Sequence, residues 1–325
     1  MLCVSNSVIV LAAGASALFC ATAMAQTYPS RPITVIVPFA AGGPVDTDVR
    51  RYTPRMAEML GQSVITDNKP GAGTSIGAGF VAKARPDGHT LLGNSSAYAV
   101  FPAFYKDLSF DPLKDLVPLT IMHDSVSVMM VPVSSPIKSF AEYLAYTRAN
   151  PGKLNVGTSG VGDISDLSGR WMHSVARTQV TFVPYKGNGP MMVDLLAGRV
   201  DASSASLVTA VPLIKSGKLR PLAVRGPRRV KLLPDVPTIN EHSGMEEFSI
   251  TNWMGFFVTG GTPAPVIEKL SGSLIAITRL PAVATELESQ GSAPVGNSPA
   301  QFKNFVAEEI TRWKKVVADA GIKSE

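Results

Sequence analysis

Short apolar runs alternate along the chain with longer segments whose apolar residues recur every three or four positions. Residues 33–37 form a β-branched run that predicts a buried strand, and residues 63–66 and 89–92 predict two more. Pro44 stands at a favourable first helical position after the first of these runs. A second helix is expected over residues 76–84. The first helix is amphipathic, with an apolar face formed by Val45, Val49, Tyr52, Met56 and Met59.

A second series of strands and helices begins near residue 126. Ser139 followed by Glu142 is typical of a capping box at the start of its first helix. Strands that alternate with helices favour parallel sheets. We therefore predict an α/β fold of two lobes that hinge like a clamshell, in which the last strand of this series returns the chain to the first lobe. The predicted strands are residues 126–131, 154–157, 181–183, 200–202 and 219–224, and the predicted helices are residues 139–149, 164–175, 191–196 and 207–215.

Two segments rich in aromatic residues follow. Trp253 lies in an apolar stretch and suits either an aromatic wall over a bound solute or a place in the core, and both roles stay open. The C-terminal segment predicts an amphipathic helix that packs on the first lobe, with a face formed by Phe302, Phe305, Ile310, Trp313 and Val317.

The N-terminal segment predicts export. An apolar run over residues 8–19 is too short to anchor the chain in a bilayer, and Ala23-Met-Ala25 matches the small-residue pattern of signal-peptide cleavage. We expect residues 1–25 to be a signal peptide, cleaved after Ala25. A lipoprotein interpretation on Cys20 is disfavoured because Phe19 occupies a position that requires a small residue. Both cysteines, Cys3 and Cys20, lie in this segment, so no disulfide or thiol chemistry is expected in the mature chain.

Charge and motifs narrow the function further. The 325-residue chain carries 30 basic and 25 acidic residues, and its densest basic run, residues 225–231, is short and interrupted, so no nucleic-acid partner is expected. The four histidines lack metal-ligand spacing, so no metal is expected. Gly71-Ala-Gly73 lacks the third glycine of a dinucleotide fingerprint and the sequence has no P-loop, so no cofactor is expected. Gly73-Thr-Ser-Ile-Gly77 matches the nucleophile-elbow pattern of serine hydrolases, but no strand precedes it. A hydrolase that uses Ser75 is therefore the less favoured alternative, and we expect no enzyme.

Four segments that follow predicted strands are rich in glycine and small hydroxyl residues: residues 40–44, 93–96, 158–162 and 184–189. Glycine allows a backbone to approach a ligand closely, and a following helix N-terminus offers unpaired N–H groups with a positive dipole end. In open α/β sheets, ligands bind at the carboxyl ends of the strands. These loops therefore predict a site for an anionic group. They contain no arginine, and Lys186 is their only cation, so backbone N–H groups and hydroxyls such as those of Ser95, Thr158 and Ser159 are expected to hold the anion.

Seven ordered segments resemble the tripartite tricarboxylate transporter receptor family, also called the Bug family. They are Tyr28-Pro-Ser-Arg-Pro-Ile33, Val37-Pro-Phe-Ala-Ala-Gly-Gly-Pro44, Asn68-Lys-Pro-Gly-Ala-Gly73, Pro86-Asp-Gly-His-Thr-Leu-Leu92, Val183-Pro-Tyr-Lys-Gly187, Leu232-Leu-Pro-Asp-Val-Pro-Thr238 and Gly261-Thr-Pro-Ala-Pro-Val266. The resemblance implies a type 2 periplasmic binding-protein fold. It also implies a periplasmic receptor that delivers a small carboxylate to membrane permease subunits. We expect a monomer.

The resemblance also assigns lobes and ligand-binding residues. Lobe 1 is expected to comprise residues 26–122 and 226–325, and lobe 2 residues 123–225. The implied ligand-binding residues of lobe 1 are Phe39, Ala40, Ala41, Gly42, Gly43, Asp46, Asn94, Ser95 and Ser96. Those of lobe 2 are Thr158, Ser159, Gly160, Tyr185, Lys186, Gly187, Ser203, Ser204 and Ser206.

Asp163 and Asp166 depart from the family pattern, which has Ser or Thr and then His in this stretch. The favoured interpretation is that they cap a helix and complement its dipole, which would leave ligand choice unchanged. The alternative is that an extra carboxylate near the site selects a ligand with a cationic group. A sensor that presents its ligand to a signalling partner also remains an alternative to transport, because the two differ in partner and not in site.

Overall fold

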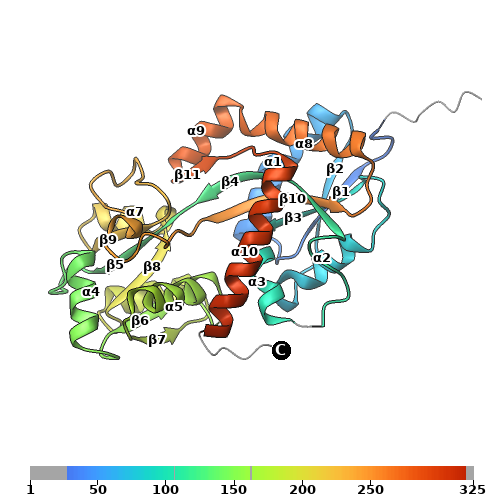
Figure 1. Cartoon of the computed structure of the whole chain (residues 1–325). Helices are drawn as coiled ribbons and strands as arrows, with labels where there is room; N and C mark the ends of the chain where they lie inside the picture. The colour runs from blue at the N-terminus through green and yellow to red at the C-terminus, as the bar shows by residue number, and fades with distance from the viewer. Residues whose placement is uncertain (1–27, 106, 162, 320–325) are drawn as a thin grey trace, which may run out of the picture.

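The computed structural model describes residues 28–105, 107–161 and 163–319, and the predicted signal peptide with its cleavage site lies outside them. The chain forms two sheets, one on each side of the molecule (Figure 1). The first sheet has the order β11-β4-β10-β3-β1-β2. Its strands are β1 (Ile33–Val37), β2 (Val64–Asn68), β3 (Thr90–Ser95), β4 (Leu116–Ser125), β10 (Asn252–Thr259) and β11 (Ser292–Pro294).

The second sheet comes from one continuous stretch of chain and has the order β7-β6-β8-β5-β9. Its strands are β5 (Ser127–Pro132), β6 (Asn155–Thr158), β7 (Thr181–Pro184), β8 (Ala202–Ser206) and β9 (Leu219–Arg225). The return to the first sheet therefore occurs after β9, through the segment that leads to β10, and the prediction that the 219–224 strand itself makes the return was wrong.

Helices cover both sheets. We call the first sheet with α1 (Pro44–Leu60), α2 (Ser75–Ala82), α3 (Ala97–Phe104), α8 (Ala264–Thr278) and α9 (Pro281–Ser289) lobe 1. Lobe 2 is the second sheet with α4 (Phe140–Ala149), α5 (Ile164–Ala176), α6 (Asn188–Leu196) and α7 (Leu207–Lys215). Two short 3-10 helices, η1 (Ala72–Thr74) and η2 (Ile239–Glu241), and the last helix, α10 (Pro299–Asp319), complete the described chain.

Neither sheet is purely parallel, which corrects the sequence prediction. β10 lies antiparallel between β3 and β4, and β5 lies antiparallel between β8 and β9. β11 also pairs antiparallel with β4. β10 and β5 are the strands that the chain enters on crossing from one lobe to the other, and they run opposite to the strands built by local βα units. The pairing with β10 also extends β3 to Ser95, and Asn94 and Ser95 are strand residues where a loop was predicted.

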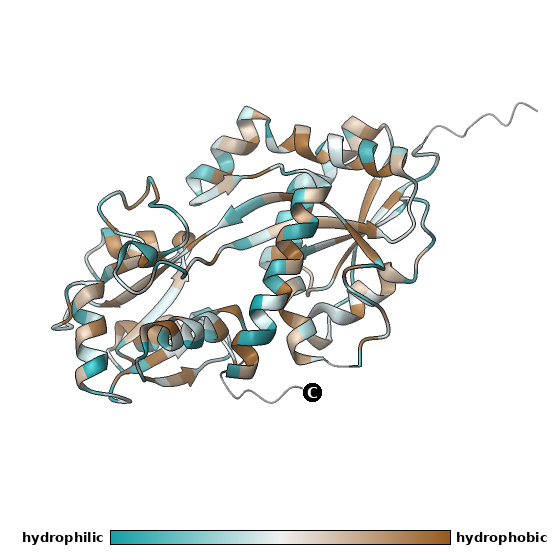
Figure 2. Ribbon diagram, in the orientation of Figure 1, coloured by the Kyte–Doolittle hydropathy of each residue, from teal (hydrophilic) through white to brown (hydrophobic). Residues whose placement is uncertain are grey.

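The last helix connects the lobes. In Figure 1, α10 starts over the first sheet and runs down to α5 of lobe 2, and Figure 2 shows hydrophilic and hydrophobic residues alternating along it. Phe302 packs against Trp253 in lobe 1, with ring centroids 5.2 Å apart, as the sequence predicted. The ring centroid of Trp313 lies 6.2 Å from that of Trp171 in α5. The helix therefore also reaches lobe 2, which the sequence did not predict. Trp253 itself is 1% exposed and belongs to the core.

Candidate functional site

The strand pairings bring the predicted loops of each lobe to one edge of its sheet. In lobe 1, β1, β2 and β3 are parallel and end at Val37, Asn68 and Ser95. In lobe 2, β6, β7 and β8 are parallel, and β9 runs the same way because both β8 and β9 pair antiparallel with β5. The chain crosses between the lobes from these same edges, after Ser125 and after Arg225. The glycine-rich loops therefore lie where the two lobes are joined.

The first loop of lobe 1 is braced by a buried carboxylate. Asp46 is 2% exposed, and its Oδ2 accepts hydrogen bonds from the Gly42 N–H at 2.9 Å and from Arg50 Nε at 2.8 Å. Asn68 Nδ2 donates to Asp46 Oδ1 at 2.9 Å and to the Phe39 carbonyl at 3.1 Å. The hydrogen bond from Arg50 is the main cause that holds the pKa of Asp46 at about 2. The predicted ligand residue Asp46 thus fixes the loop, whose residues Ala40, Ala41 and Gly42 are exposed.

A second cluster lies at the end of β3. Asn94 is fully buried, its Nδ2 donates to Thr74 Oγ1 at 3.2 Å, and its Oδ1 accepts from the Ser95 N–H at 2.8 Å. The Ser96 N–H donates to the Trp253 carbonyl at 2.9 Å. These predicted donors are thus engaged within the protein, while the Ser95 side chain lies partly exposed beside them.

Sequence reasoning missed Thr74, which joins the second strand-exit loop to this cluster. Thr74 is buried and has φ +89°, in the left-handed region that a β-branched side chain rarely adopts. Strain of this kind often marks functional sites, where the surrounding structure enforces it. The hydrogen bond to Asn94 is one such constraint. The signal in the sequence was the stretch from Gly71 to Thr74, which we considered as part of a hydrolase motif and of a family segment without assigning it a ligand-facing residue.

The hydrolase alternative finds little support at Ser75. A 3-10 turn, not a strand, precedes Ser75 at the start of α2. Three of the histidines have other partners: His89 contacts Asp87, His123 contacts Tyr52, and His173 contacts Tyr143 and Thr178. A nucleophile needs a base within hydrogen-bond reach, so these histidines do not serve Ser75.

The first loop of lobe 2 closes around Asp163. Ser159 Oγ donates to Asp163 Oδ2, and Ser165 Oγ donates to Asp163 Oδ1 at 2.7 Å. The Asp166 N–H donates to Asp163 Oδ1 at 2.9 Å, so Asp163 caps α5 as predicted. Asp166 lies in the first turn of that helix and pairs with Arg170 at 3.1 Å.

The other predicted residues of lobe 2 divide between the loop and the sheet. The N–H groups of Tyr185 and Gly187 donate to the carbonyls of Thr158 and Ser159, both at 2.9 Å, which ties the two loops together. Lys186 is exposed between them. Ser203 is fully buried and donates to the Gly157 carbonyl at 2.9 Å; Ser206 contacts Thr209 at 3.2 Å. Because side chains alternate along a strand, Ser204 lies on the opposite face of β8 from Ser203.

An arginine that the sequence prediction missed lies beside these loops. Arg225 ends β9 and is 3% exposed, and its Nη2 donates to Ser168 Oγ. Its Nε has no hydrogen-bond partner, and neither has Thr158 Oγ1, which is 1% exposed. Both residues line a cavity of about 10 Å³ with Ser165 and Ser204. Burial lowers the pKa of Arg225 to about 10, and the charge of Asp163 opposes that shift. Arg225 could have been identified by including the end of β9 among the strand ends at which ligands bind.

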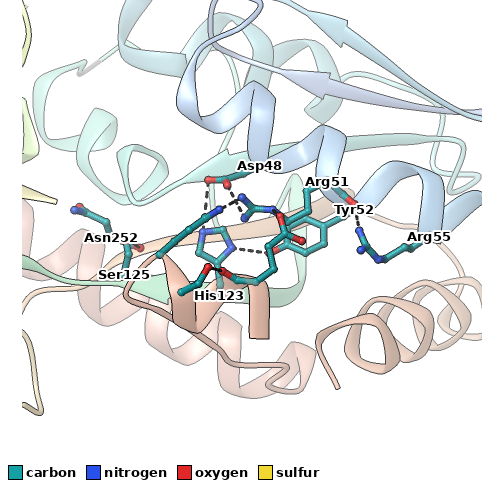
Figure 3. A network of polar contacts seen from close by, with 10 residues as sticks. Asp48, Arg51, Tyr52, Arg55, His123, Ser125 and Asn252 are labelled. Carbon is teal, nitrogen blue, oxygen red and sulfur yellow. Dashed lines mark hydrogen bonds and ion pairs between the residues drawn. The ribbon is translucent and has the colours of Figure 1, made fainter. Parts of the chain in front are cut away.

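A polar network fixes α1 to the strands at the crossing (Figure 3). Arg51 bonds Asp48 at 3.0 Å, and Asp48 Oδ2 lies 3.5 Å from His123 Nε2 on β4. The other ring nitrogen of His123 is 2.8 Å from the Tyr52 hydroxyl. Arg51 also reaches α9 through Glu286, at 2.7 Å. The helix that follows the first ligand-facing loop is therefore held rigidly beside the crossing.

A larger cavity, of about 340 Å³, lies elsewhere, between α5, β7 and the end of α10. Its lining includes Arg170, Trp171, Phe182 and Val316 and none of the predicted ligand-binding residues. Within the described ranges, His, Asp and Glu side chains do not gather into groups of three or more that would suit a metal ion. Across the same ranges, no helix combines the length and the hydropathy needed to cross a bilayer.

Comparison with known sequences places the chain in a family. A family model described as the tripartite tricarboxylate transporter family receptor matches residues 49–322. The UPF0065 protein in the TAR-I ttuE-ttuC' intergenic region of Agrobacterium vitis is 37% identical over 299 residues, which cover 91% of this chain and 86% of that protein. Protein BugT of Bordetella pertussis is 34% identical over 311 residues, which cover 95% of each chain.

Solved structures of similar proteins have the same fold over most of this chain. The periplasmic binding protein BugD is 32% identical with a TM-score of 0.73, over 92% of this chain and 100% of that chain. The Rpa4515 protein of R. palustris, solved with adipate, is 32% identical with a TM-score of 0.75, over 91% and 99% of the two chains. MatC of Rhodopseudomonas palustris, solved with malate, is 34% identical with a TM-score of 0.70, over 89% and 100%.

The fold and these likenesses define a two-lobed solute-binding protein of the periplasmic binding-protein type. Within that class, the chain belongs to the tripartite tricarboxylate transporter receptor family, as the sequence motifs predicted.

Proposed function

We propose that this protein captures a small carboxylate between its lobes and delivers it to the permease subunits of a tripartite transporter. The observation that carries the proposal is the placement of glycine- and hydroxyl-rich loops at the facing strand edges of both lobes, in a chain similar to receptors solved with adipate and with malate. In this proposal the protein acts as a monomer without enzymatic activity or nucleic-acid partner, and signal-peptide cleavage after Ala25 releases it into the periplasm.

In this proposal, the two lobes are residues 26–122 with 226–325, and residues 123–225. The first boundary falls inside β4, and the chain crosses three residues later, after Ser125. The lobes close over the ligand by bending at the two crossings. The ligand carboxylate is held on lobe 1 by the backbone N–H groups of the exposed residues Ala40 and Ala41 and by the hydroxyl of Ser95. The Gly42 N–H is already bonded to Asp46. Each hydrogen bond to a charged group contributes about 1.5–3 kcal/mol net, so three or four give micromolar affinity after the cost of closure.

A thermal-shift panel tests the function. The mature protein is unfolded and refolded to remove resident ligand, then melted with mono-, di- and tricarboxylates, aromatic acids, amino acids, sugars and polyamines. Ligand at a thousandfold its Kd stabilises by about 4 kcal/mol, which should raise the Tm by roughly 10 °C. Ser95→Ala should weaken the best acid about tenfold, since it removes one hydrogen bond to a charged group. A sugar or a polyamine that shifts the Tm while no acid does would refute the carboxylate assignment.

Ser75→Ala separates binding from hydrolysis. The variant should bind the best acid with the affinity of the parent protein, because the Ser75 hydroxyl has no place in the proposed grip. Ester hydrolysis by the purified protein that disappears in Ser75→Ala would instead establish the hydrolase.

A further inference from the structure

The N-terminal turn of α5 holds a set of donors that suits a carboxylate. The donors are the hydroxyls of Ser159 and Ser165 and the N–H of Asp166, and all three donate to the side chain of Asp163. A helix N-terminus with adjacent hydroxyls binds anions well, because the N–H groups are otherwise unpaired and the dipole end is positive. Here the anion at the helix N-terminus is the carboxylate of Asp163, which belongs to the protein itself.

This arrangement goes beyond a helix cap. A cap needs only the bond from the Asp166 N–H to Asp163 Oδ1. Oδ2 bonds instead to Ser159, which belongs to the turn before the helix, and the Ser159 N–H in turn donates to Ser165 Oγ at 2.9 Å. The carboxylate therefore connects Ser159, which follows β6, to the first turn of α5.

The two acidic residues at the start of α5, Asp163 and Asp166, each have a basic partner within the protein. The buried guanidinium of Arg225 interacts electrostatically with Asp163, and Asp166 pairs with Arg170 at 3.1 Å. Arg225 Nε and Thr158 Oγ1, both more than nine-tenths buried, remain without hydrogen-bond partners in the small cavity beside Ser165. Unpaired buried donors are costly, and a cavity of about 10 Å³ suits one polar group of the size of a water molecule.

We infer that Asp163 occupies the place in lobe 2 that the second carboxylate of a diacid would take, so that this receptor selects acids whose far end donates hydrogen bonds: an amide, a hydroxyl or an ammonium group. The inference rests on the proposed capture of a carboxylate by lobe 1. A second ligand carboxylate would meet a like charge and donors that are already used. An ionised carboxylate has about four acceptor positions, and three of those of Asp163 are filled. The remaining one accepts from the ligand.

Two series of acids of matched length test the inference by calorimetric titration of the refolded mature protein. Each series has four or six carbons and ends in a carboxylate, an amide, a hydroxyl or an ammonium group. The unmodified protein should bind at least one donor-ended acid ten times more tightly than the diacid of equal length.

Asp163→Asn and Asp163→Ser should raise the affinity for the diacid about tenfold and lower the preference for donor-ended acids. Asparagine and serine both cap helices, so the fold is expected to persist, and far-UV circular dichroism checks it. Asp235→Asn removes the same charge from an exposed position and serves as the matched control.

Two results would overturn the inference. One is a parent protein that binds the diacid at least as tightly as every donor-ended acid. The other is a ratio of affinities that both Asp163 variants leave unchanged while acids still bind, which would reduce Asp163 to a helix cap and leave the proposed function intact. Binding of no acid at all would refute the proposed function, and the inference with it.

Discussion

At the scale of single residues, polar side chains near the ligand-facing loops mostly bond to the protein itself. Asp46, Asn94 and Ser203 are each at most 2% exposed, and each has hydrogen-bond partners in the backbone or in another side chain. Buried polar groups that lack partners cost free energy, so these side chains are best understood as supports that shape the loops.

His173 should make stability depend on pH. Its ring is 4% exposed between Tyr143 and Thr178, and burial, with the positive charge of Arg225, lowers its pKa to about 4. The folded state thus favours the neutral ring, while the unfolded chain takes up a proton near pH 6.5. Stability from this group is present above pH 6.5 and is lost as the pH falls toward 4, by about 3 kcal/mol.

The measurement is urea denaturation of the parent protein and of His173→Gln between pH 7 and pH 4. The difference in free energy of unfolding between the two proteins should shrink as the pH falls, because the variant has no ring to protonate. Burial also lowers the pKa of His242. This histidine therefore adds the same pH dependence to the free energy of unfolding of both proteins. A constant difference across this range would show that His173 is not the titrating group.

At the scale of elements, close packing positions the ligand-facing loops. Gly77 of α2 lies so near β1 that a methyl group there would come within 2.8 Å of the Pro38 side chain and 2.9 Å of the Lys69 carbonyl. Pro38 and Lys69 begin the two strand-exit loops of lobe 1. The helix therefore sets the position of both loops.

Gly77→Ala should push α2 away from these loops. We expect a destabilisation of about 1–3 kcal/mol from overpacking, together with weaker binding of the best acid. Gly272→Ala in α8 is the matched control, because nothing lies within 4 Å of the added methyl group. It should stabilise the protein by about 0.5–1 kcal/mol through higher helix propensity and leave binding unchanged. Equal effects of the two substitutions on binding would contradict this role of α2.

Some helices and strands could be predicted from the sequence pattern and others could not. The first amphipathic helix and the N-cap at Ser139 were predicted, and Ser139 Oγ accepts from the Glu142 N–H at 3.1 Å. The reciprocal bond of a capping box is displaced by one residue, because the Glu142 side chain accepts from the Lys138 N–H at 2.7 Å. β10 was missed. It is a central strand, paired on both sides and buried on both faces of the sheet, so it reads as an unbroken apolar run without the alternation that marks a half-exposed strand. The strand at residues 200–202 was placed too early, since β8 consists of small residues, mostly serine, over Ala202–Ser206.

At the scale of the whole molecule, the two strand crossings and α10 help to join the lobes. Trp313 is fully buried where α10 meets lobe 2, and its Nε1 donates to Glu309 Oε2 at 3.2 Å. Arg312 of the same helix lies over the ring of Trp171, 5.3 Å from its centroid. With these contacts in place, the lobes should unfold together.

Trp313→Ala should weaken that coupling. Loss of a buried tryptophan costs about 3–5 kcal/mol. Urea denaturation followed by far-UV circular dichroism and by fluorescence should give coincident transitions in the parent protein and separated ones in the variant. Trp171 in lobe 2 and Trp253 in lobe 1 remain as probes. Met59→Ala, at a side chain that is 46% exposed, should cost less than about 1 kcal/mol and serves as the control. Transitions that still coincide in Trp313→Ala would mean that the packing of α10 on lobe 2 is not needed to couple the lobes.

The sequence by itself determined the α/β class, the alternation of strands and helices, the family and the loops that lie at the strand ends. Those features depend on local periods and on short runs of residues, which a single chain displays directly. The tertiary structure decided the antiparallel crossings, the bridge of α10 to α5 and the partners of each polar side chain. Arg225 and Thr74 join the site because segments distant in sequence meet there. Contacts of that kind depend on packing between elements, and no local pattern records them.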